Sequence, residues 1–234
     1  MRQKLVALLL LHPLAGLADG FVVDKVYTPY VQLLETEIEY RALAIHDNSD
    51  ELDNTIIHKL GIGRAIADHW AAEFYITRYE DKNSSLTIDA YEIEAKWQLT
   101  EQGEFDSDFG LIFELEHTQD TPAWEAASTL VVTRAIGRWV NTANLSLVYE
   151  WGNHIEDEVE TAISLQGRYR HSAALEPALE FYAGQDTRGI GPVLAGTQRL
   201  GSQNQIHWEL GTIFGLGSTS PEVSVRLLLE YEFY

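Results

Sequence analysis

Apolar and polar residues alternate along this chain from residue 36 to its last residue. In the segment 91–99, Tyr91, Ile93 and Ala95 fall on one face, and Glu92 and Glu94 fall on the other. Because successive side chains of a strand point to opposite faces, this pattern predicts β-strands. Nine segments carry it clearly: 37–44, 72–79, 91–99, 111–116, 142–151, 161–170, 175–184, 205–214 and 223–234. Three weaker segments, 55–66, 126–137 and 190–199, bring the predicted set to twelve.

The connections between these segments fall into two classes. Polar and mostly acidic stretches such as 46–53 and 80–85 follow every odd-numbered segment, whereas several others are as short as Ala67–His69 or Gly137–Arg138. The stretch 98–104 is a long exception. Alternating short and long connections are typical of antiparallel barrels that cross an outer membrane. The sequence therefore predicts an all-β chain forming a closed antiparallel transmembrane β-barrel of about twelve strands, with ten as the alternative.

The alternation alone does not say which face is inside, and a soluble lipid-binding barrel is the alternative architecture. In the nine clear segments the apolar face carries many aromatic and small residues and, apart from Arg78, no charge. A transmembrane barrel turns such a face to lipid and its polar face to the lumen. This orientation predicts a membrane girdle of Tyr40, Trp97, Trp151, Trp208, Tyr231 and Phe233. It predicts lumen positions for Glu37, Glu39, Arg41, Glu92, Glu94, Lys96, Glu114, Glu116, Glu150, Arg168, Arg170, Glu180, His207, Glu209, Arg226, Glu230 and Glu232.

The N-terminus has the pattern of a secretory signal. Arg2 and Lys4 precede an apolar run, and small residues at Gly16 and Ala18 fit cleavage after Ala18. The uncharged stretch 5–18 is too short to cross a membrane as a helix. We therefore expect a signal peptide over 1–18, a barrel over 36–234, and between them a segment 19–35 that either plugs the lumen or extends the first strand. These features predict an outer-membrane location in a Gram-negative bacterium.

Charge and composition exclude several classes of function. The chain carries a net charge of −20, and without residues 1–18 it would carry −22. This acidity argues against a nucleic-acid partner and against docking on anionic lipid, both of which need clustered basic residues. The 45% of hydrophobic residues are too many for a disordered acidic tail. The absence of Cys excludes disulfides, Cys-based zinc sites and cysteine nucleophiles.

Three short motifs carry a family resemblance. The segments Glu37–Arg41, Trp97–Gly103 and Gly189–Val193 are similar to those of Gram-negative porin-like transporters grouped with the phenol-degradation MetA-pathway proteins. The resemblance implies passage of small solutes and supplies no catalytic residues. The last strand ends in Tyr231, Phe233 and Tyr234 and resembles the assembly signal of outer-membrane barrels, although the aromatic positions are shifted by one. The expected partners are outer-membrane lipid and lipopolysaccharide, the barrel-assembly machinery through this strand, and small solutes.

The candidate chemistry has simpler structural explanations. His207 and Glu209 share one face of a strand and could act as acid and base. A hydrogen-bonded lumen pair is the preferred interpretation, because the sequence places no third catalytic member beside them. Asp68 and His69 fall on an expected turn, and Gly61-Ile-Gly63 marks close backbone packing or a bend. The acidic stretch 47–53 could attract Ca²⁺, but it lacks the full calcium-loop motif. The sequence thus predicts no catalytic residue, no metal site, no cofactor and no enzymatic activity.

The acidic bias of the polar faces favours one function. Rings of acidic side chains in a water-filled pore favour cations, so we expect porin-like passive transport of small neutral or cationic solutes. The first alternative is a structural or loop-displaying barrel whose lumen is closed by salt bridges. The second is a hydrolase with a Ser/His/Asp or Asp/His cluster at the rim.

Overall fold

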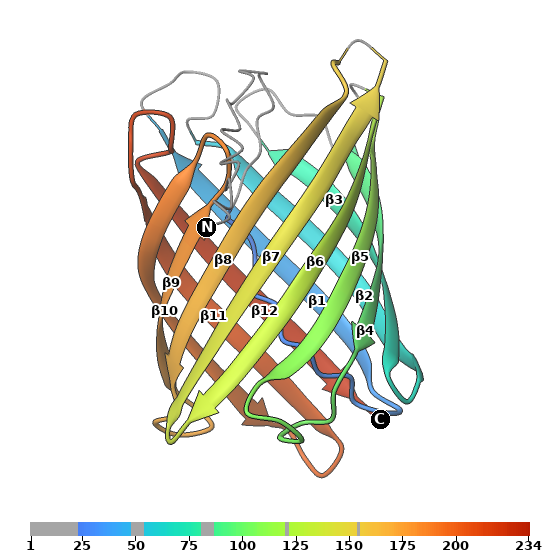
Figure 1. Cartoon of the computed structure of the whole chain (residues 1–234), viewed down its shortest axis with the longest axis vertical. Coiled ribbons are helices and arrows are strands. Elements are labelled where there is room, and N and C mark those ends of the chain that lie inside the picture. Colours follow the sequence, from blue (N-terminus) through green and yellow to red (C-terminus); the bar gives the residue numbers. More distant parts are fainter. Residues whose placement is uncertain (1–22, 48–53, 81–86, 120–121, 154) are drawn as a thin grey trace, which may run out of the picture.

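Twelve antiparallel strands form one closed barrel in the computed structural model of this protein (Figure 1). The structure describes residues 23–47, 54–80, 87–119, 122–153 and 155–234. None of these residues belongs to a helix long and apolar enough to cross a membrane. The predicted fold class and strand number are confirmed, including the three strands with weak alternation.

The strands follow one another around the wall in chain order. They are β1 (Thr36–His46), β2 (Ile56–Ala67), β3 (Trp70–Glu80), β4 (Ala90–Gln98), β5 (Asp108–Thr118), β6 (Ala123–Ile136), β7 (Trp139–Gly152), β8 (Glu158–Tyr169), β9 (Glu176–Ala183), β10 (Arg188–Arg199), β11 (Asn204–Gly215) and β12 (Val223–Phe233). β1 closes the barrel by pairing with β12 in a register that joins Thr36 to Phe233 and His46 to Val223. Since β1 also pairs with β2, the wall has no free strand edge.

The two ends of the barrel differ. At one end, two-residue turns at Asp68–His69 and Gly137–Arg138 join β2 to β3 and β6 to β7. Gly137 has a φ of +62°, a left-handed conformation that favours glycine in a tight hairpin. The last residue, Tyr234, lies at this end, which we call the turn end (Figure 1). The opposite end, where β1 stops and β2 starts, we call the loop end.

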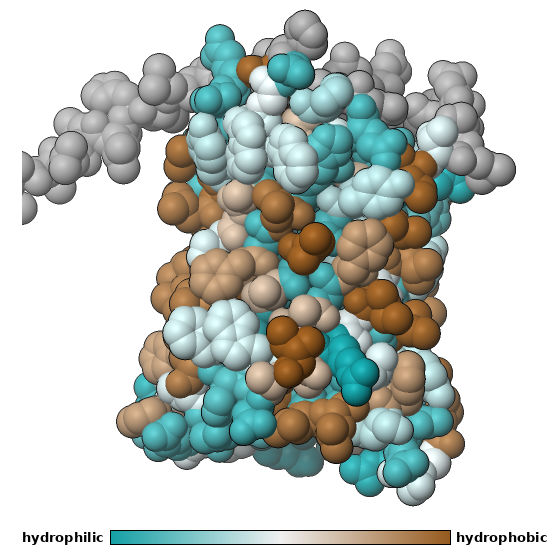
Figure 2. Space-filling view, turned by 90° about the vertical axis from the view of Figure 1, so that its right-hand side faces the viewer, coloured by the Kyte–Doolittle hydropathy of each residue, from teal (hydrophilic) through white to brown (hydrophobic). Residues whose placement is uncertain are grey.

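The apolar rows face outward. Ile62, Leu147 and Leu179 are about half exposed, whereas Glu94 and Glu180 are fully buried. In Figure 2, brown side chains spread over the middle of the wall and teal side chains gather toward its ends. This arrangement inverts that of a soluble barrel and is the one a lipid-facing wall requires.

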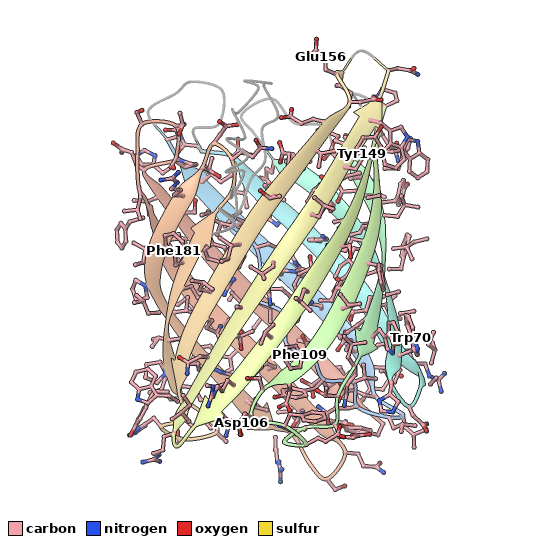
Figure 3. All side chains as sticks on the ribbon, in the orientation of Figure 1. Trp70, Asp106, Phe109, Tyr149, Glu156 and Phe181 are labelled. Carbon is pink, nitrogen blue, oxygen red and sulfur yellow. The ribbon has the colours of Figure 1, made fainter. Side chains whose placement is uncertain are left out.

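Aromatic side chains gather on the outer face near both ends. At the turn end Trp70 stacks on Trp97 with ring centroids 5.0 Å apart, and Tyr231 stacks on Phe233. At the loop end Trp151 lies between Trp124 and Tyr149. Figure 3 shows Tyr149 near one end of the wall and Trp70 near the other.

Two of the predicted girdle residues lie away from the strand ends. Tyr40 and Trp208 stand on either side of Leu229, several residues inside their strands. The Tyr40 hydroxyl lies 2.8 Å from His58 Nδ1 on the neighbouring strand. These two side chains therefore lie on the outer face nearer the middle of the barrel's height than the aromatic groups at its ends.

Candidate functional site

The predicted lumen residues all fall on the inward phase of their strands. On β1 the inward positions Glu39 and Arg41 are almost completely buried, while the outward Ile38 is 43% exposed. The same phase places Glu92, Glu94 and Lys96 inward on β4 and Arg226, Glu230 and Glu232 inward on β12. The remaining candidates that lie within strands are Glu37, Glu114, Glu116, Glu150, Arg168, Glu180, His207 and Glu209. Arg170 comes one residue after β8 and lines the same space as Arg168.

The strand register aligns the inward glutamates in two rows, one interrupted at Gly61 and Tyr75 and the other at Gly63, Ala127 and Val148. We call them the upper row, Glu230, Glu39, Glu92, Glu116, Glu125, Glu150 and Glu158, and the lower row, Glu232, Glu37, Glu73, Glu94, Glu114 and Glu160. In the upper row, four successive strand pairs put carboxylates directly opposite each other from Glu92 to Glu158. Because the strands are staggered around the barrel, each row starts near the turn end on β12 and reaches the loop end on β8. The lumen wall thus carries a winding acidic stripe from end to end.

Two glycines on β2 interrupt the stripe without blocking it. Gly61 and Gly63 occupy the inward positions at which both rows cross this strand. A Cβ at Gly61 would come within 2.2 Å of the Tyr75 ring. A glycine is therefore required at this position for Tyr75 to lie flat against the wall. This close approach agrees with the interpretation of Gly61-Ile-Gly63 as a site of close packing.

Basic side chains neutralise the stripe only near its start and middle. Lys25 bonds Glu39 at 2.8 Å, Lys96 bonds Glu73 at 3.3 Å, and Lys59 bonds Glu92 at 2.5 Å. Among the described residues, no Lys or Arg forms an ion pair with Glu114, Glu116, Glu125, Glu150, Glu158 or Glu160. The part of the stripe on β5 to β8 therefore presents carboxyl groups to the lumen without a Lys or Arg ion-pair partner among the described residues.

A second cluster lies on the opposite side of the wall, around Arg226. The Arg226 guanidinium is 1% exposed and donates to Glu209 at 2.7 Å, Glu180 at 3.0 Å and the Tyr182 hydroxyl at 2.6 Å. It also donates to the backbone oxygen of Asp24. This cluster is the salt-bridged arrangement expected of a closed lumen, but it occupies only one side of the barrel.

The N-terminal segment passes through the lumen. We call residues 23–34 the lumen segment; no strand of the wall includes them (Figure 1). Its backbone is held by side chains of the wall, since Tyr27 exchanges two hydrogen bonds with Asn144, and the Val31 amide donates to Gln98 at 2.7 Å. The Tyr30 hydroxyl donates to Asp108 at 2.8 Å. Wall side chains thus replace the strand partners that this extended backbone lacks.

Two charged residues of the lumen segment dock against the middle of the wall. Asp24 pairs with Arg41, and Lys25 lies over the Tyr75 ring, 5.6 Å from its centroid. Arg41 and Lys59 contact the same ring at about 5 Å. One buried tyrosine therefore gathers three cations around its electron-rich face, an arrangement that stabilises positive charge in a confined space.

Cavities remain on both sides of this contact. A cavity of ≈ 320 Å³ opens toward the turn end, between the lumen segment and side chains such as Glu37, Arg168, His207 and Glu230. A smaller one of ≈ 160 Å³ lies toward the loop end, bordered by Asp24, Lys59 and Glu116. The waist between the cavities is formed by residues 24–27 of the lumen segment together with Arg41 and Arg226.

The last residue ties the barrel rim to the lumen segment. The Tyr234 hydroxyl lies 2.8 Å from Glu35 and 2.9 Å from Gln32. Burial and the bond to Glu35 raise the pKa of Tyr234 to about 12. Tyr234 therefore stays a neutral donor at ordinary pH. Tyr234 does not belong to the lipid-facing row, and these contacts give it a structural role at the rim.

The two pairs considered as catalytic candidates lie in different surroundings. His207 Nε2 lies 3.3 Å from Glu209 Oε1, but the other Glu209 oxygen is held by Arg226. His69 lies on a turn beside Glu101, 3.6 Å away. The Thr197 hydroxyl lies 3.3 Å from His207 Nδ1, on the other side of the imidazole from Glu209. Of the acidic stretch 47–53, residues 48–53 lie outside the described residues.

Several lumen residues were not predicted from the sequence. Lys59 lies on the weak strand β2, and Lys25 lies on a segment without alternation. Glu125, Glu158 and Glu160 lie at or beyond the edges of the predicted strand ranges. Extending each alternation by two or four residues at constant phase would have found the three glutamates. No pattern would have found Lys25.

The placement of the lumen segment predicts a specific cross-link. A Cβ on Gly110 would lie 2.9 Å from Pro29 Cβ, and a disulfide needs about 3.5–4.5 Å between these atoms. Since the chain has no Cys, the double variant Pro29→Cys/Gly110→Cys should form one disulfide after a small local shift. Mass spectrometry of proteolytic peptides would detect the linked pair. The two single variants are the controls, and two freely alkylated thiols in the folded double variant would contradict the placement.

Comparisons with known proteins concern the fold. No protein-family model matches the sequence, and no curated protein matches it. Among solved structures, the COG4313 outer membrane channel from Pseudomonas putida F1 superposes with a TM-score of 0.59 at 13% identity, covering 90% of this chain and 99% of that chain. The KdgM porin in complex with disordered oligogalacturonate gives 0.56 at 9% identity, covering 85% and 98%. The β domain of the Bordetella autotransporter BrkA gives 0.52 at 11% identity, covering 86% and 99%.

These proteins share the barrel architecture and belong to different kinds of outer-membrane protein. Two are described as a channel and a porin, and the third as part of an autotransporter. The fold by itself therefore does not specify one activity. The resemblance to the MetA-pathway transporters stays a prediction.

Proposed function

We propose that the chain is an outer-membrane channel of a Gram-negative bacterium that passively passes small neutral or cationic solutes. The outward rows are apolar and ringed by aromatic side chains at both ends, which supports residence in a bilayer. Two solved barrels of the same architecture are described as an outer membrane channel and a porin. The lumen of this chain is polar, which suits a path for water-soluble molecules.

The observation that carries the proposal is the winding acidic stripe. From Glu92 to Glu158 the upper row has a carboxylate on every strand, so a cation that leaves one group meets the next on the neighbouring strand. No Lys or Arg of the described residues forms an ion pair with the carboxylates of the stripe on β5 to β8; Arg168 on β8 pairs with Glu176 instead. Closely spaced sites of moderate strength allow entry and release, which conduction requires.

The lumen segment sets the size of what passes. It separates the cavities of ≈ 320 Å³ and ≈ 160 Å³ and meets Arg41 and Arg226 at the waist. Twelve strands enclose less space than the sixteen of an open porin, and the segment reduces this space further. We therefore infer slow passage of small solutes rather than a wide diffusion pore.

The first test is the ion selectivity of the reconstituted channel. In a planar bilayer with a KCl gradient, the reversal potential should have the sign of a K⁺-selective pore. The triple variant Glu125→Gln/Glu150→Gln/Glu158→Gln should move it toward zero, because it removes unpaired charges from the stripe. The effect should shrink at high salt, where charges are screened.

A matched control and a contrary outcome make this test decisive. Glu101→Gln/Glu104→Gln/Asp106→Asn removes the same charge from the connection between β4 and β5, outside the lumen rows, and should leave the selectivity unchanged. A preference for Cl⁻ would contradict the proposal. Complete absence of conductance would favour the second candidate, a closed structural barrel.

The second candidate rests on the contacts at the waist. Arg226, Tyr182 and Asp24 form a buried network that crosses from wall to lumen segment. If this network never opens, the protein would stabilise the membrane or display its loops without conducting. Conductance separates the two candidates directly.

The partners follow from the same location. The outer wall would contact lipid and lipopolysaccharide, and the strand Val223–Phe233 would be recognised by the barrel-assembly machinery during insertion. Phe233 lies on the outward row and Tyr234 turns to the rim. Recognition would therefore involve Tyr231 and Phe233 rather than the final residue.

A further inference from the structure

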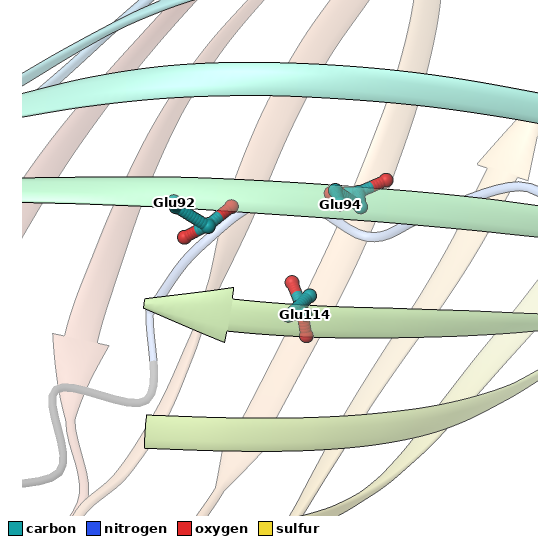
Figure 4. A group of neighbouring side chains, drawn as sticks. All are labelled: Glu92, Glu94 and Glu114. Atoms are coloured by element: carbon teal, nitrogen blue, oxygen red, sulfur yellow. The ribbon is translucent and has the colours of Figure 1, made fainter. Parts of the chain in front are cut away.

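Three glutamates of the lumen wall converge on one point. The register of β4 and β5 puts Glu94 directly opposite Glu114, and Glu92 lies on the neighbouring inward position. One carboxylate oxygen from each of the three lies within 4.8 Å of the others. Figure 4 shows the three side chains side by side on two neighbouring strands. Directly opposed like charges destabilise a strand pair unless something neutralises them.

Glu94 lies buried in the wall without a hydrogen-bond partner in the part of the chain that the structure describes. Its side chain is 0% exposed, and both carboxylate oxygens lack a hydrogen-bond donor among the described residues. Glu92 is 5% exposed, and its Oε1 likewise lacks a hydrogen-bond donor among the described residues. Its Oε2 accepts a hydrogen bond from Lys59 at 2.5 Å. A buried carboxylate without a partner is costly, so native structures pair such groups or place a metal ion beside them. The unpaired oxygens therefore indicate a missing positive ligand.

The neighbouring cations are already engaged elsewhere. Lys96 bonds Glu73, and Lys25 bonds Glu39. Lys59 neutralises only one of the three carboxylates, and the Tyr27 hydroxyl donates a neutral hydrogen bond to Glu114 at 2.9 Å. The cluster thus keeps an excess of negative charge that the described residues do not balance.

We propose that Glu92, Glu94 and Glu114 bind a calcium ion in the lumen wall. Ca²⁺ takes oxygen ligands at about 2.3–2.6 Å in flexible geometry. Three oxygens within 4.8 Å of one another can surround an ion at about the Ca²⁺–oxygen distance. Mg²⁺ requires a smaller and near-octahedral set of ligands, which three carboxylates on two strands do not provide. The absence of sulfur and imidazole donors disfavours softer metals.

The ion can reach the site from the loop end. Glu116 and Lys59 border the cavity of ≈ 160 Å³ on that side. Glu116 stands opposite Glu92 across the β4–β5 pair, next to the three ligands. Binding at this site does not depend on whether the barrel conducts, so the two proposals can fail separately.

Calcium binding to the whole folded barrel tests the proposal. The chain would be treated with a chelator in detergent micelles at about pH 8, where carboxyl groups are ordinarily ionised, and titrated with radioactive Ca²⁺ by equilibrium dialysis. The wild type should bind one more Ca²⁺ per chain than the Glu94→Gln variant. The matched control Glu160→Gln changes the same charge in the same row, away from the cluster, and should retain the wild-type number.

Thermal unfolding of the same variants gives a second readout. Ca²⁺ should raise the unfolding temperature of the wild type and of Glu160→Gln more than that of Glu94→Gln, because ligands stabilise the state that binds them. If Glu94→Gln does not fold, as judged by heat-modifiable gel mobility, Glu114→Gln takes its place. Equal numbers of bound Ca²⁺ in the wild type and the cluster variant would overturn the proposal. So would the absence of saturable binding, which would mean that the carboxyl groups share protons instead.

Discussion

Deletion of residues 23–31 is expected to raise the single-channel conductance several-fold. These residues lie inside the lumen, where Asp24 meets Arg41 and Tyr27 bonds Asn144. Removing them would join the two cavities into one passage bounded only by the wall. A twelve-stranded wall without a plug encloses more space than the eight-stranded barrels that side chains fill. Planar-bilayer recordings of the refolded variant would measure the change.

A size-matched variant separates volume from docking. Replacing residues 23–31 with a Gly/Ser stretch of equal length keeps a backbone in place but removes the side-chain contacts with Arg41, Glu114 and Asp108. We expect noisy conductance between the wild-type and deletion levels. Heat-modifiable gel mobility would confirm that each variant forms a barrel. A folded deletion variant with unchanged conductance would show that the segment does not limit the path.

Arg226→Leu is expected to lower the free energy of unfolding by about 3–5 kcal/mol, because it leaves buried carboxylates without their counter-charge. Glu180 and Glu209 both bond this guanidinium, and Glu180 is 0% exposed. The variant also removes a donor to Asp24 in the lumen segment. Urea titration in lipid vesicles, followed by Trp fluorescence, would measure the loss.

Three further variants identify the cause. Arg226→Lys should keep part of the stability, since one ammonium group cannot replace the fork of a guanidinium. Adding Glu180→Gln and Glu209→Gln to Arg226→Leu should recover part of the loss by removing the uncompensated charges. Arg199→Leu, at the exposed end of β10, should change the stability by less than about 0.5 kcal/mol. A loss in Arg199→Leu as large as that in Arg226→Leu would refute the explanation.

The sequence was sufficient for the fold and for the phase of each strand. A period of two leaves two choices of face, and the nearly uncharged rows with their aromatic residues decide between them. This is why Glu39, Glu94 and Arg226 could be placed inward from the sequence. The lengths of strands were less certain where polar or small residues interrupt the pattern, as at Asp108 and Gly110 of β5.

The register could not be predicted, and the candidate sites depend on it. Alternation is unchanged when a strand slides by two residues, so it does not say that Glu94 stands opposite Glu114. For the same reason, the alternation does not predict that the inward glutamates align in two rows. Lys59 was missed because Gly61 and Gly63 leave β2 with a weak polar face. The reason for these glycines lies on the neighbouring strands: Gly61 leaves room for the Tyr75 ring, and Gly63 leaves room for the Glu37 and Glu73 side chains.

The contacts of the lumen segment impose an order on folding. Asp24 is bonded by Tyr182 and Arg226, which lie 158 and 202 residues later in the chain, and Gln32 is bonded by Tyr234, also 202 residues later. These partners come together only when β12 has joined β1. We therefore expect the lumen segment, which precedes the strands of the wall in the chain, to reach its final place last. The segment can contact both sides of the lumen only after the wall has closed, so a docked segment indicates a closed barrel.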